Sequence, residues 1–434
     1  MSESGKGTKN KISVFTGISI VVANMIGTGV FTTLGFQLDK LGNTAVILSL
    51  WVFGGILALS GAFSYAEVGS VIRKSGGEYA FLSHIYHPVI GYVSGWISLT
   101  VGFAAPIAIA AIAFTEYLPV QTDCHKLIAV GLLAVVTAFH CRDLKVSSRF
   151  QNIFTVFKIL LIISILCAGI FMPSAGGTPV SFGHDYCREI FSTAFAVSLI
   201  YVSYSYSGWN AAAYITEEFK NPVKALPVAL VGGAVIVTVL YTLMQYVFLK
   251  HVPAAELTGR LDVGAIAMEH IIGVKAASIF GGAISLLLIS GISAMVWIGS
   301  RVTAGIAAEY GLWRFFRQKG NEIPVKALML QGIISAFLII TGTFEQIMIY
   351  CGVLLTVSSL LVVTGVFVLR YKKEGGYSFR SPFFPLFQVI FIAASLWMIV
   401  FAVITKTEES LLGLLNIGVG LMTYIISKSQ SINK

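Results

Sequence analysis

The sequence has 434 residues, of which 56% are hydrophobic and only 11% are charged, and its mean hydropathy is +0.85. Soluble domains carry about a quarter charged residues, so this composition excludes a water-soluble fold and indicates a protein embedded in a membrane. The net charge of +9 comes without any stretch of interleaved basic and aromatic residues, which argues against nucleic-acid binding.

Apolar runs long enough to cross a bilayer recur along the whole chain. A helix needs about 20 mostly apolar residues to span the hydrocarbon core, and we count twelve such runs. Their connections are short, and the longest, residues 250–275, is too short to fold independently. The sequence therefore predicts an all-α integral membrane protein with a single transmembrane domain. The predicted spans begin at Ile12, Thr44, Val89, Leu127, Phe150, Ile190, Ala225, Ala276, Val325, Gln346, Phe383 and Leu411.

The first span contains Gly27-Thr28-Gly29, which weakens a continuous helix. Glycines in membrane helices also let neighbouring helices pack closely, so this motif alone does not establish a broken helix. The second span carries Glu67 near its inner end, shortly before Arg73, Lys74 and a turn at residues 75–79. We interpret Glu67 as a structural residue at the membrane interface, and direct contact with a substrate is the less favoured alternative.

The fifth span contains Lys158 ahead of an apolar run without charges. An ionisable group inside the bilayer is costly and needs a partner, which makes Lys158 a candidate functional residue. The alternative is that its long side chain reaches back to the cytoplasmic interface.

The sixth span is interrupted by Ser-Tyr-Ser-Tyr-Ser-Gly at residues 203–208, where serines compete for backbone hydrogen bonds. Spans one and six open two successive units of five helices, which is where transporters with inverted repeats place discontinuous helices. An unwound helix exposes N–H groups on one side and carbonyl groups on the other, which suits a zwitterion. We expect amides near Thr28 and Gly29 to hold an α-carboxylate, and carbonyls around Ser203 and Ser205 to hold an ammonium group.

Most of the 29 lysines and arginines fall in the loops on the side of the amino terminus, among them Lys6, Lys9 and Lys11. The side of a membrane protein that retains these residues is usually cytoplasmic. We therefore predict that both termini are cytoplasmic.

The histidines lie near span ends or in loops, and the five cysteines have no CxxC spacing, so we expect neither a metal site nor a cofactor. Cys124 and Cys187 fall on the predicted outer side. They could form a disulfide in an oxidising exterior or be two unrelated cysteines, and the sequence leaves both readings open.

Four motifs occur in order in matching spans: residues 25–31 (Met-Ile-Gly-Thr-Gly-Val-Phe), 75–79 (Ser-Gly-Gly-Glu-Tyr), 207–222 and 299–301 (Gly-Ser-Arg). With these motifs the chain resembles the amino acid-polyamine-organocation superfamily over nearly its whole length, and within it the L-type amino acid transporter branch. The resemblance implies a five-plus-five inverted repeat, with repeats over residues 12–172 and 188–370, accessory helices over residues 383–427, and spans one and six discontinuous. The substrate would lie between spans one, three, six, eight and ten and cross by alternating access.

By motif matching, the resemblance assigns substrate binding to residues of the two interruptions, with Tyr204 at the family's gating-aromatic position. Ser207 stands where many relatives have glycine, so the family's substrate range does not transfer. A pocket lined by Met25, Phe103 and tyrosines indicates neutral side chains. The assigned substrate-binding residues are Met25, Gly27, Thr28, Gly29, Tyr204, Ser205 and Ser207.

Lys158 also resembles the fifth-span lysine of sodium-independent members, whose ammonium group stands in for a sodium ion and bridges spans one and eight. Ser293 is the candidate partner in span eight. If Lys158 keeps its proton during the cycle, exchange of one amino acid for another is expected, and if it loses the proton, proton-coupled symport is expected.

The predicted function is sodium-independent transport across the plasma membrane, with exchange of neutral L-amino acids favoured. The alternative within transport is a proton-coupled amino acid or polyamine symporter. A polycation would be favoured by a pair of carboxylates, and the sequence places no such pair in the site region. A channel or a membrane enzyme is the alternative from another class. The chain has neither a selectivity-loop signature nor an intramembrane nucleophile and base, so we expect it not to be an enzyme.

Cys124 lies where some animal exchangers of this branch bond to an accessory glycoprotein subunit. We interpret the position of Cys124 as coincidental and expect function without an obligatory protein partner. The sequence predicts neither which amino acid is carried nor the oligomeric state.

Overall fold

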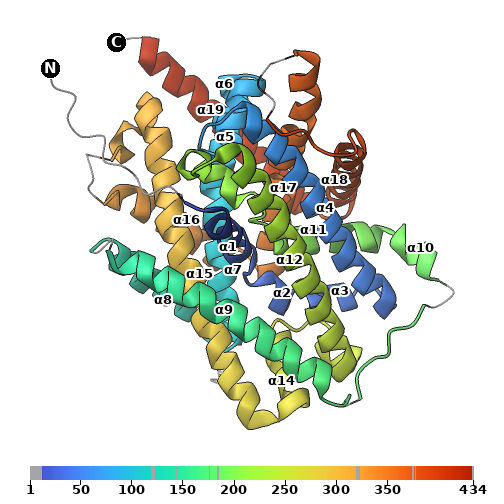
Figure 1. The fold of residues 1–434 in the computed structure, drawn as a ribbon. Helices are drawn as coiled ribbons and strands as arrows, with labels where there is room; N and C mark the ends of the chain where they lie inside the picture. Colours follow the sequence, from blue (N-terminus) through green and yellow to red (C-terminus); the bar gives the residue numbers. More distant parts are fainter. Residues whose placement is uncertain are drawn as a thin grey trace.

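The computed structural model describes residues 12–118, 123–142, 145–174, 176–182, 185–318, 323–373, 376 and 378–432 (Figure 1). Lys6, Lys9 and Lys11, which contribute to the predicted orientation, lie outside this part of the chain. The described residues form helices joined by turns and loops, and their one β-type pairing is an isolated bridge between Ile12 and Phe219. The prediction of an all-α fold is confirmed for these residues.

Nine helices of the described chain are long and apolar enough to cross a membrane. Seven of them are single helices: α4 (Thr44–Val71), α9 (Lys145–Phe171), α12 (Pro222–His251), α15 (Val274–Glu309), α17 (Phe344–Tyr371), α18 (Leu386–Thr405) and α19 (Thr407–Ile432). The other two are composed of consecutive segments: α1 (Val14–Met25) with α2 (Gly29–Thr32), and α6 (Pro88–Ile97) and η1 (Ser98–Phe103) with α7 (Ala104–Glu116).

Four apolar helices are shorter: α8 (His125–His140), α11 (Thr193–Ser205), α14 (Val263–Ile272) and α16 (Val325–Thr341). Three of them, α8, α11 and α16, fall in the predicted fourth, sixth and ninth spans. With 16, 13 and 17 residues, they are shorter than the roughly 20 residues that a perpendicular span requires. The nine longer helices fall in the nine other predicted spans.

The remaining short helices lie in the connections between the longer ones. They are α3 (Leu34–Leu38), α5 (Glu78–Ile85), α10 (Tyr186–Ile190), η2 (Ala211–Glu218), α13 (Ala254–Leu257) and η3 (Gly311–Phe316). The connection over residues 250–275, which the sequence predicts is too short to fold independently, contains α13 and α14. The sequence analysis missed α14 because its 10 residues are far fewer than a span requires.

Local signals fix where several long helices begin. The side chain of Asn43 accepts a hydrogen bond from the Ala45 N–H at the start of α4. The side chain of Ser192 accepts a hydrogen bond from the Phe195 N–H at the start of α11. Thr343 and Gln346 form a reciprocal capping box at the start of α17. These caps satisfy N–H groups that a helix leaves without an internal partner.

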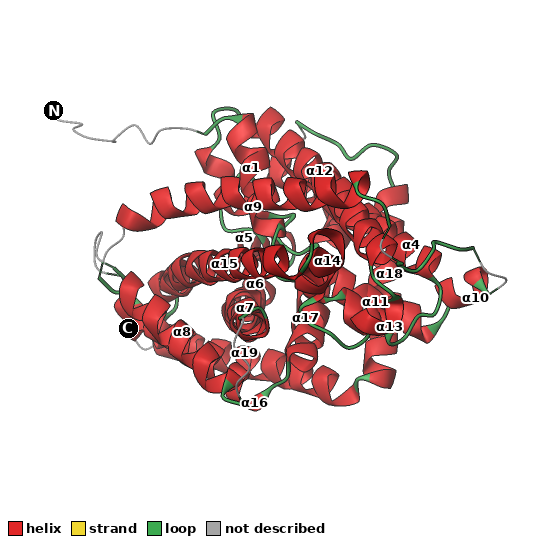
Figure 2. Ribbon diagram, turned by 90° about the horizontal axis from the view of Figure 1, so that it is seen from below, coloured by secondary structure: helices red, strands yellow, loops and turns green. Residues whose placement is uncertain are grey.

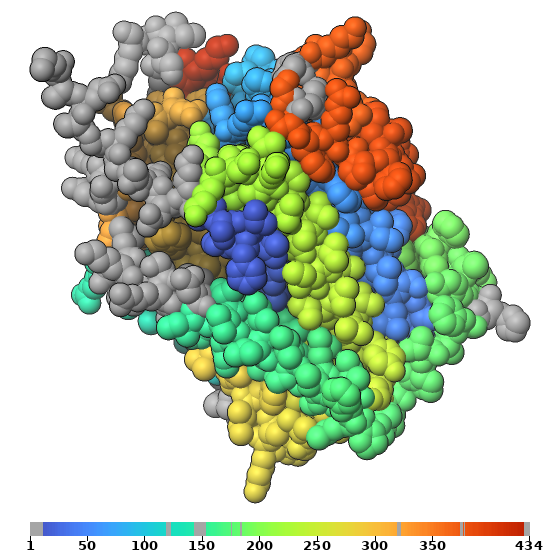
Figure 3. Space-filling view, in the orientation of Figure 1, coloured from blue at the N-terminus to red at the C-terminus, as the bar shows by residue number. Residues whose placement is uncertain are grey.

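The centre of the bundle is formed by the span that contains α6, η1 and α7. Of the residues in the most apolar stretch of this span, 78% are buried, compared with 22% in the corresponding stretch of α19. Seen along the bundle, α7 lies in the middle, and it contacts α8, α15, α16 and α17 (Figure 2). The short helix α1 reaches the surface between α9 and α12 (Figure 3). Among the nine candidate spans of the described chain, the one that contains α6, η1 and α7 is therefore the most buried.

Candidate functional site

A cavity of about 940 Å³ lies where α1 gives way to α2 and where α11 gives way to η2. Its walls also include residues of α4, η1, α7, α9, α15, α17 and α18. Of the residues predicted from the sequence to form the site, Ser293 alone does not line this cavity. The predicted residues that line it are Met25, Gly27, Thr28, Gly29, Lys158, Tyr204, Ser205 and Ser207.

The backbone changes direction between α1 and α2. Helix α1 ends at Met25, and Ile26 has an extended conformation with φ −71° and ψ 93°. In a continuous α-helix the Met25 carbonyl would accept a hydrogen bond from the Gly29 N–H. Here it accepts a 2.5 Å hydrogen bond from the hydroxyl of Tyr241 in α12. The N–H groups at Gly27, Thr28 and Gly29 thus border the cavity at a change of backbone direction.

The end of α11 is also irregular. The Ser207 N–H donates to the Tyr204 carbonyl at 2.9 Å, so the Ser203 carbonyl lacks the donor that a continuous α-helix would provide. Gly208 follows with φ +96°, a conformation that favours glycine. A Cβ atom at Gly208 would also lie 2.9 Å from the Asn24 carbonyl carbon. Glycine is therefore required at position 208 both by its backbone conformation and by the close approach of α1.

The two interruptions touch each other. A Cβ atom built on Gly29 would lie 2.3 Å from the Ser205 Oγ atom. Ser205 Oγ also lies 3.3 Å from the hydroxyl of Thr33 and donates to the Tyr201 carbonyl at 2.9 Å. Residues of both interruptions consequently line a single cavity.

Residues of α4 and α12, which were not predicted from the sequence, support the two interruptions. The hydroxyl of Tyr206 donates to the Trp51 carbonyl at 2.9 Å, and the rings of Tyr206 and Tyr241 are 5.2 Å apart. One helical turn after Tyr241, the side chain of Gln245 donates to the Val30 carbonyl at 3.0 Å. The signal that could have identified them is the pair Tyr241 and Gln245, two polar groups spaced i, i+4 in an apolar helix.

Lys158 and Ser293 lie in different surroundings. Lys158 is 9% exposed and lines the cavity together with Thr155. Ser293 is buried, and its hydroxyl is 2.8 Å from the Nε2 atom of His140 at the end of α8. Among the described contacts no hydrogen bond joins Lys158 to Ser293. The bridge between these two residues therefore stays a prediction, and His140 is a neighbour of Ser293 that the sequence analysis missed.

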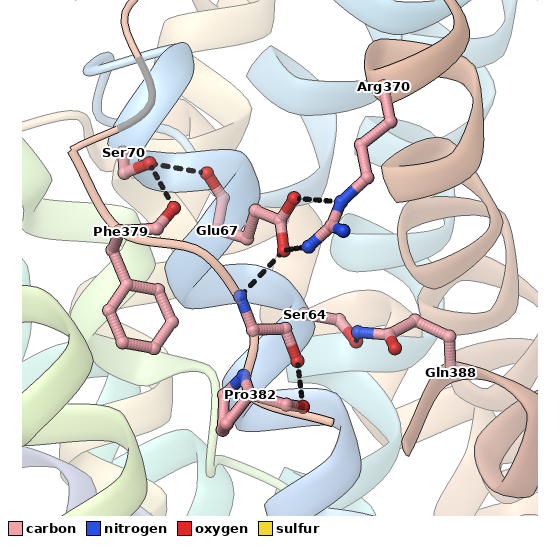
Figure 4. A network of polar contacts seen from close by, with 8 residues as sticks. Ser64, Glu67, Ser70, Arg370, Phe379, Pro382 and Gln388 are labelled. Carbon is pink, nitrogen blue, oxygen red and sulfur yellow. Dashed lines mark hydrogen bonds and ion pairs between the residues drawn. The ribbon is translucent and has the colours of Figure 1, made fainter. Parts of the chain in front are cut away.

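Glu67 occupies a structural position outside the cavity. It is fully buried, and its carboxylate accepts two hydrogen bonds from Arg370, at 2.6 and 2.8 Å, and one from the Ser381 N–H at 2.7 Å (Figure 4). In the same network the Ser70 hydroxyl donates to the Phe379 carbonyl at 3.1 Å. These contacts hold α4 against the end of α17 and the segment before α18, in agreement with the interpretation of Glu67 as structural.

The two ends of the cavity differ. Toward the predicted cytoplasmic side its lining includes the exposed residues Glu218, Arg301 and Glu309. On the opposite side, Phe36 and Phe344 stack with ring centroids 5.9 Å apart. This aromatic contact lies beside α2 and α3, away from the exposed end of the cavity.

Ion pairs lie beside this aromatic contact. The Glu345 carboxylate accepts a hydrogen bond from the Tyr201 hydroxyl at 2.5 Å and one from Lys406 at 3.0 Å, and Lys40 lies 3.7 Å away. The cluster joins the segment after α3 to α11, to the start of α17 and to the connection between α18 and α19.

Comparison with known proteins shows to which family the sequence is related. A family model described as amino acid permease matches residues 12–423. The human b(0,+)-type amino acid transporter 1 is 27% identical over 432 residues, which cover 96% of this chain and 88% of the relative. The human large neutral amino acids transporter small subunit 2 is 26% identical over 443 residues, covering 97% and 81%. The human cystine/glutamate transporter is 26% identical over 389 residues, covering 87% and 77%.

These relatives are amino acid transporters and not enzymes. The match extends over nearly the whole described chain, including both helix interruptions and the cavity between them. The chain therefore belongs to the amino acid permease family, in agreement with the resemblance found in its motifs.

Proposed function

We propose that the protein is a sodium-independent secondary transporter that exchanges neutral L-amino acids across the plasma membrane by alternating access. The observation that carries the proposal is the contact of the two helix interruptions at one cavity, where Gly29 lies against Ser205. Every amino acid shares an α-carboxylate and an α-ammonium group, which need donors and acceptors respectively. The N–H groups at residues 27–29 and the carbonyl groups near Ser203 and Ser205 offer both.

The charges around the cavity support a neutral side chain. Glu218, Arg301 and Glu309 lie at its exposed end. Glu78 is buried, and its carboxylate already accepts hydrogen bonds from Tyr65 at 2.8 Å and from Asn210 and Tyr214. Among the described lining residues, the one carboxylate away from this exposed end therefore already has its partners, and a cationic side chain would find no further carboxylate there. This supports neutral amino acids over polyamines.

The architecture that we infer has twelve spans in a five-plus-five inverted repeat, with repeats over residues 12–172 and 188–370 and accessory helices over residues 383–427. In it, α1–α2 and α11–η2 are the discontinuous openings of the two repeats. Family membership supports this arrangement, as does the occurrence of both interruptions at the first helix of a repeat. Both termini would lie in the cytoplasm.

Lys158 would act as a fixed cation beside the first interruption. It is buried in α9 and lines the same cavity as Ile26 and Gly27. A permanent ammonium group at this place would hold unwound carbonyls without a sodium ion. Its place in the cavity wall also fits the second candidate, proton-coupled symport, in which Lys158 would release its proton during the cycle.

One chain contains the complete cavity, so we propose that it transports without an obligatory protein partner. The name of one relative describes it as a small subunit, and Cys124 of this chain is exposed at the start of α8. Transport by the purified chain alone would support the proposal. Transport that appears only when a second subunit is supplied would contradict it.

The test of function is uptake of radiolabelled neutral amino acids into liposomes that contain the purified protein, under imposed sodium or pH gradients. Uptake that requires an internal amino acid and ignores both gradients establishes sodium-independent exchange. Uptake into empty liposomes driven by a pH gradient establishes symport instead, and sodium dependence contradicts the role of Lys158.

Lys158→Ala is expected to abolish exchange. Lys126→Ala serves as the matched control, because this exposed lysine at the start of α8 bonds to the Ile340 carbonyl and does not line the cavity. Equal activity of both variants would remove Lys158 from the mechanism.

A further inference from the structure

Helix α18 contributes to the cavity wall, although it belongs to the pair of helices outside the two inferred repeats. Phe391, Ser395 and Met398 of this helix line the cavity. Their spacing of i, i+4 and i+7 places all three on one face of α18. The cavity therefore extends past the substrate backbone site toward α18.

The opposite wall of this extension comes from the interrupted end of α11. The hydroxyl of Ser203 donates to the Sδ atom of Met398 at 3.5 Å. Trp209 stands edge-on to the ring of Phe391, with 6.4 Å between the centroids. Ser203 and Trp209 flank the inferred substrate residues Ser205 and Ser207 in the sequence, and all four line the same cavity, so the extension is continuous with the backbone site.

Ser395 is the polar group in this extension that lacks a partner. It is 1% exposed, and its Oγ atom has no hydrogen-bond partner among the described residues. A serine in a membrane helix commonly bonds to the carbonyl four residues before it, as Ser205 does with Tyr201. A buried hydroxyl without a partner is unfavourable, and a hydrogen-bonding group of a ligand would relieve that cost.

The Ser203 hydroxyl is also available to a ligand. Its partner is a thioether sulfur, which is a weak acceptor, so a carbonyl or hydroxyl oxygen of a substrate would replace this bond favourably. Phe391, Trp209 and Met398 supply an apolar surface around the two hydroxyls. The extension thus combines an apolar wall with two hydroxyl groups and no charge.

We propose that this extension between α11 and α18 binds the substrate side chain and that Ser395 determines specificity for neutral side chains with a hydroxyl or carboxamide group. The inference rests on the proposed function and names its substrate class. A site whose buried polar group needs a partner discriminates against an isostere that lacks one. Threonine and valine have nearly the same shape, but only threonine has a hydroxyl group that could bond to Ser395.

The experiment measures initial uptake of threonine and valine into liposomes that contain wild type or Ser395→Ala. Wild type is expected to prefer threonine about tenfold or more in kcat/KM, and Ser395→Ala to lower this preference about tenfold. Alanine is expected to be carried equally well by both, because its side chain does not reach Ser395. An equal threonine preference in both proteins would overturn the inference while leaving the proposed function intact. Absence of uptake of every amino acid by wild type would overturn both.

Two further variants separate specificity from folding. Ser198→Ala removes another fully buried hydroxyl without a partner among the described residues, on α11 but outside the cavity lining. It is expected to keep the wild-type preference. Ser395→Thr retains a hydroxyl and is expected to keep most of the preference. If Ser198→Ala changed the preference as much as Ser395→Ala, or if Ser395→Thr lost it completely, a specific role of the Ser395 hydroxyl would be overturned.

Discussion

Gly29 at the start of α2 lies so close to Ser205 at the end of α11 that a Cβ atom on Gly29 would be 2.7 Å from the Ser205 Cα atom and 2.3 Å from its Oγ atom. The Oγ atom could move away by rotation about χ1, but the Cα atom belongs to the backbone. The two helix interruptions can therefore approach this closely only while residue 29 has no side chain.

Gly29→Ala is accordingly expected to separate the interruptions and to lower transport at least tenfold. The measurement is exchange activity in liposomes at equal amounts of folded protein. Gly282→Ala is the matched control, because a Cβ atom on this glycine of α15 would meet nothing within 4 Å. A Gly29→Ala protein that transports as well as Gly282→Ala would show that the close contact is not needed for binding.

Tyr241→Phe tests the support behind the first interruption. The change removes the hydroxyl that donates to the Met25 carbonyl at 2.5 Å and leaves that buried carbonyl without this donor. A lost partner of this kind costs about 1–3 kcal/mol, so we expect the affinity for substrate to fall by roughly tenfold, at 1.4 kcal/mol per decade.

The affinity is measured as the substrate concentration that gives half-maximal exchange. Tyr246→Phe is the control, because this tyrosine lies on the same helix and is 40% exposed. Equal affinities of Tyr241→Phe and Tyr246→Phe would show that the first interruption does not depend on the tyrosine hydroxyl.

The apolar runs, the glycines at 27 and 29 and the serines at 203–207 are local signals. For that reason nine of the twelve predicted spans coincide with described helices long enough to cross a membrane, and eight of the nine predicted site residues line the cavity. Contacts that depend on tertiary structure could not be predicted in this way. Glu67 and Arg370 are 303 positions apart, and nothing near either residue indicates the other. The contribution of α18 to the cavity likewise follows from how α11 and α18 pack.

Ser207→Asp tests the inferred selectivity for neutral substrates. Ser207 lines the cavity beside the second interruption, so the substitution places a carboxylate where the side chain of a cationic substrate could reach it. Opposite charges about 4 Å apart near a protein surface attract by about 4 kcal/mol, part of which is lost to desolvation. We expect arginine to become an inhibitor of leucine exchange at a concentration at least tenfold lower than for wild type.

Ser207→Asn is the matched control, since it has the same size as aspartate without the charge. It is expected to leave inhibition by arginine unchanged. If Ser207→Asn promoted inhibition by arginine as strongly as Ser207→Asp, the effect would come from size, and the electrostatic account of the cavity would be wrong.

The network around Glu67 leads to a prediction about stability. Glu67→Ala leaves the guanidinium group of Arg370, whose side chain is only 24% exposed, without its carboxylate partner. Removing one member of a buried ion pair costs about 3–5 kcal/mol, so we expect a clearly lower apparent melting temperature of the purified protein in detergent.

Arg260→Ala is the control, because it breaks the ion pair with Asp262 at an arginine that is 56% exposed, where a pair contributes about 1 kcal/mol or less. Replacing Glu67 and Arg370 together by methionine is expected to restore much of the loss, because no uncompensated charge then remains. If Glu67→Ala melted at the same temperature as Arg260→Ala, the contact between α4 and α17 would not depend on this ion pair.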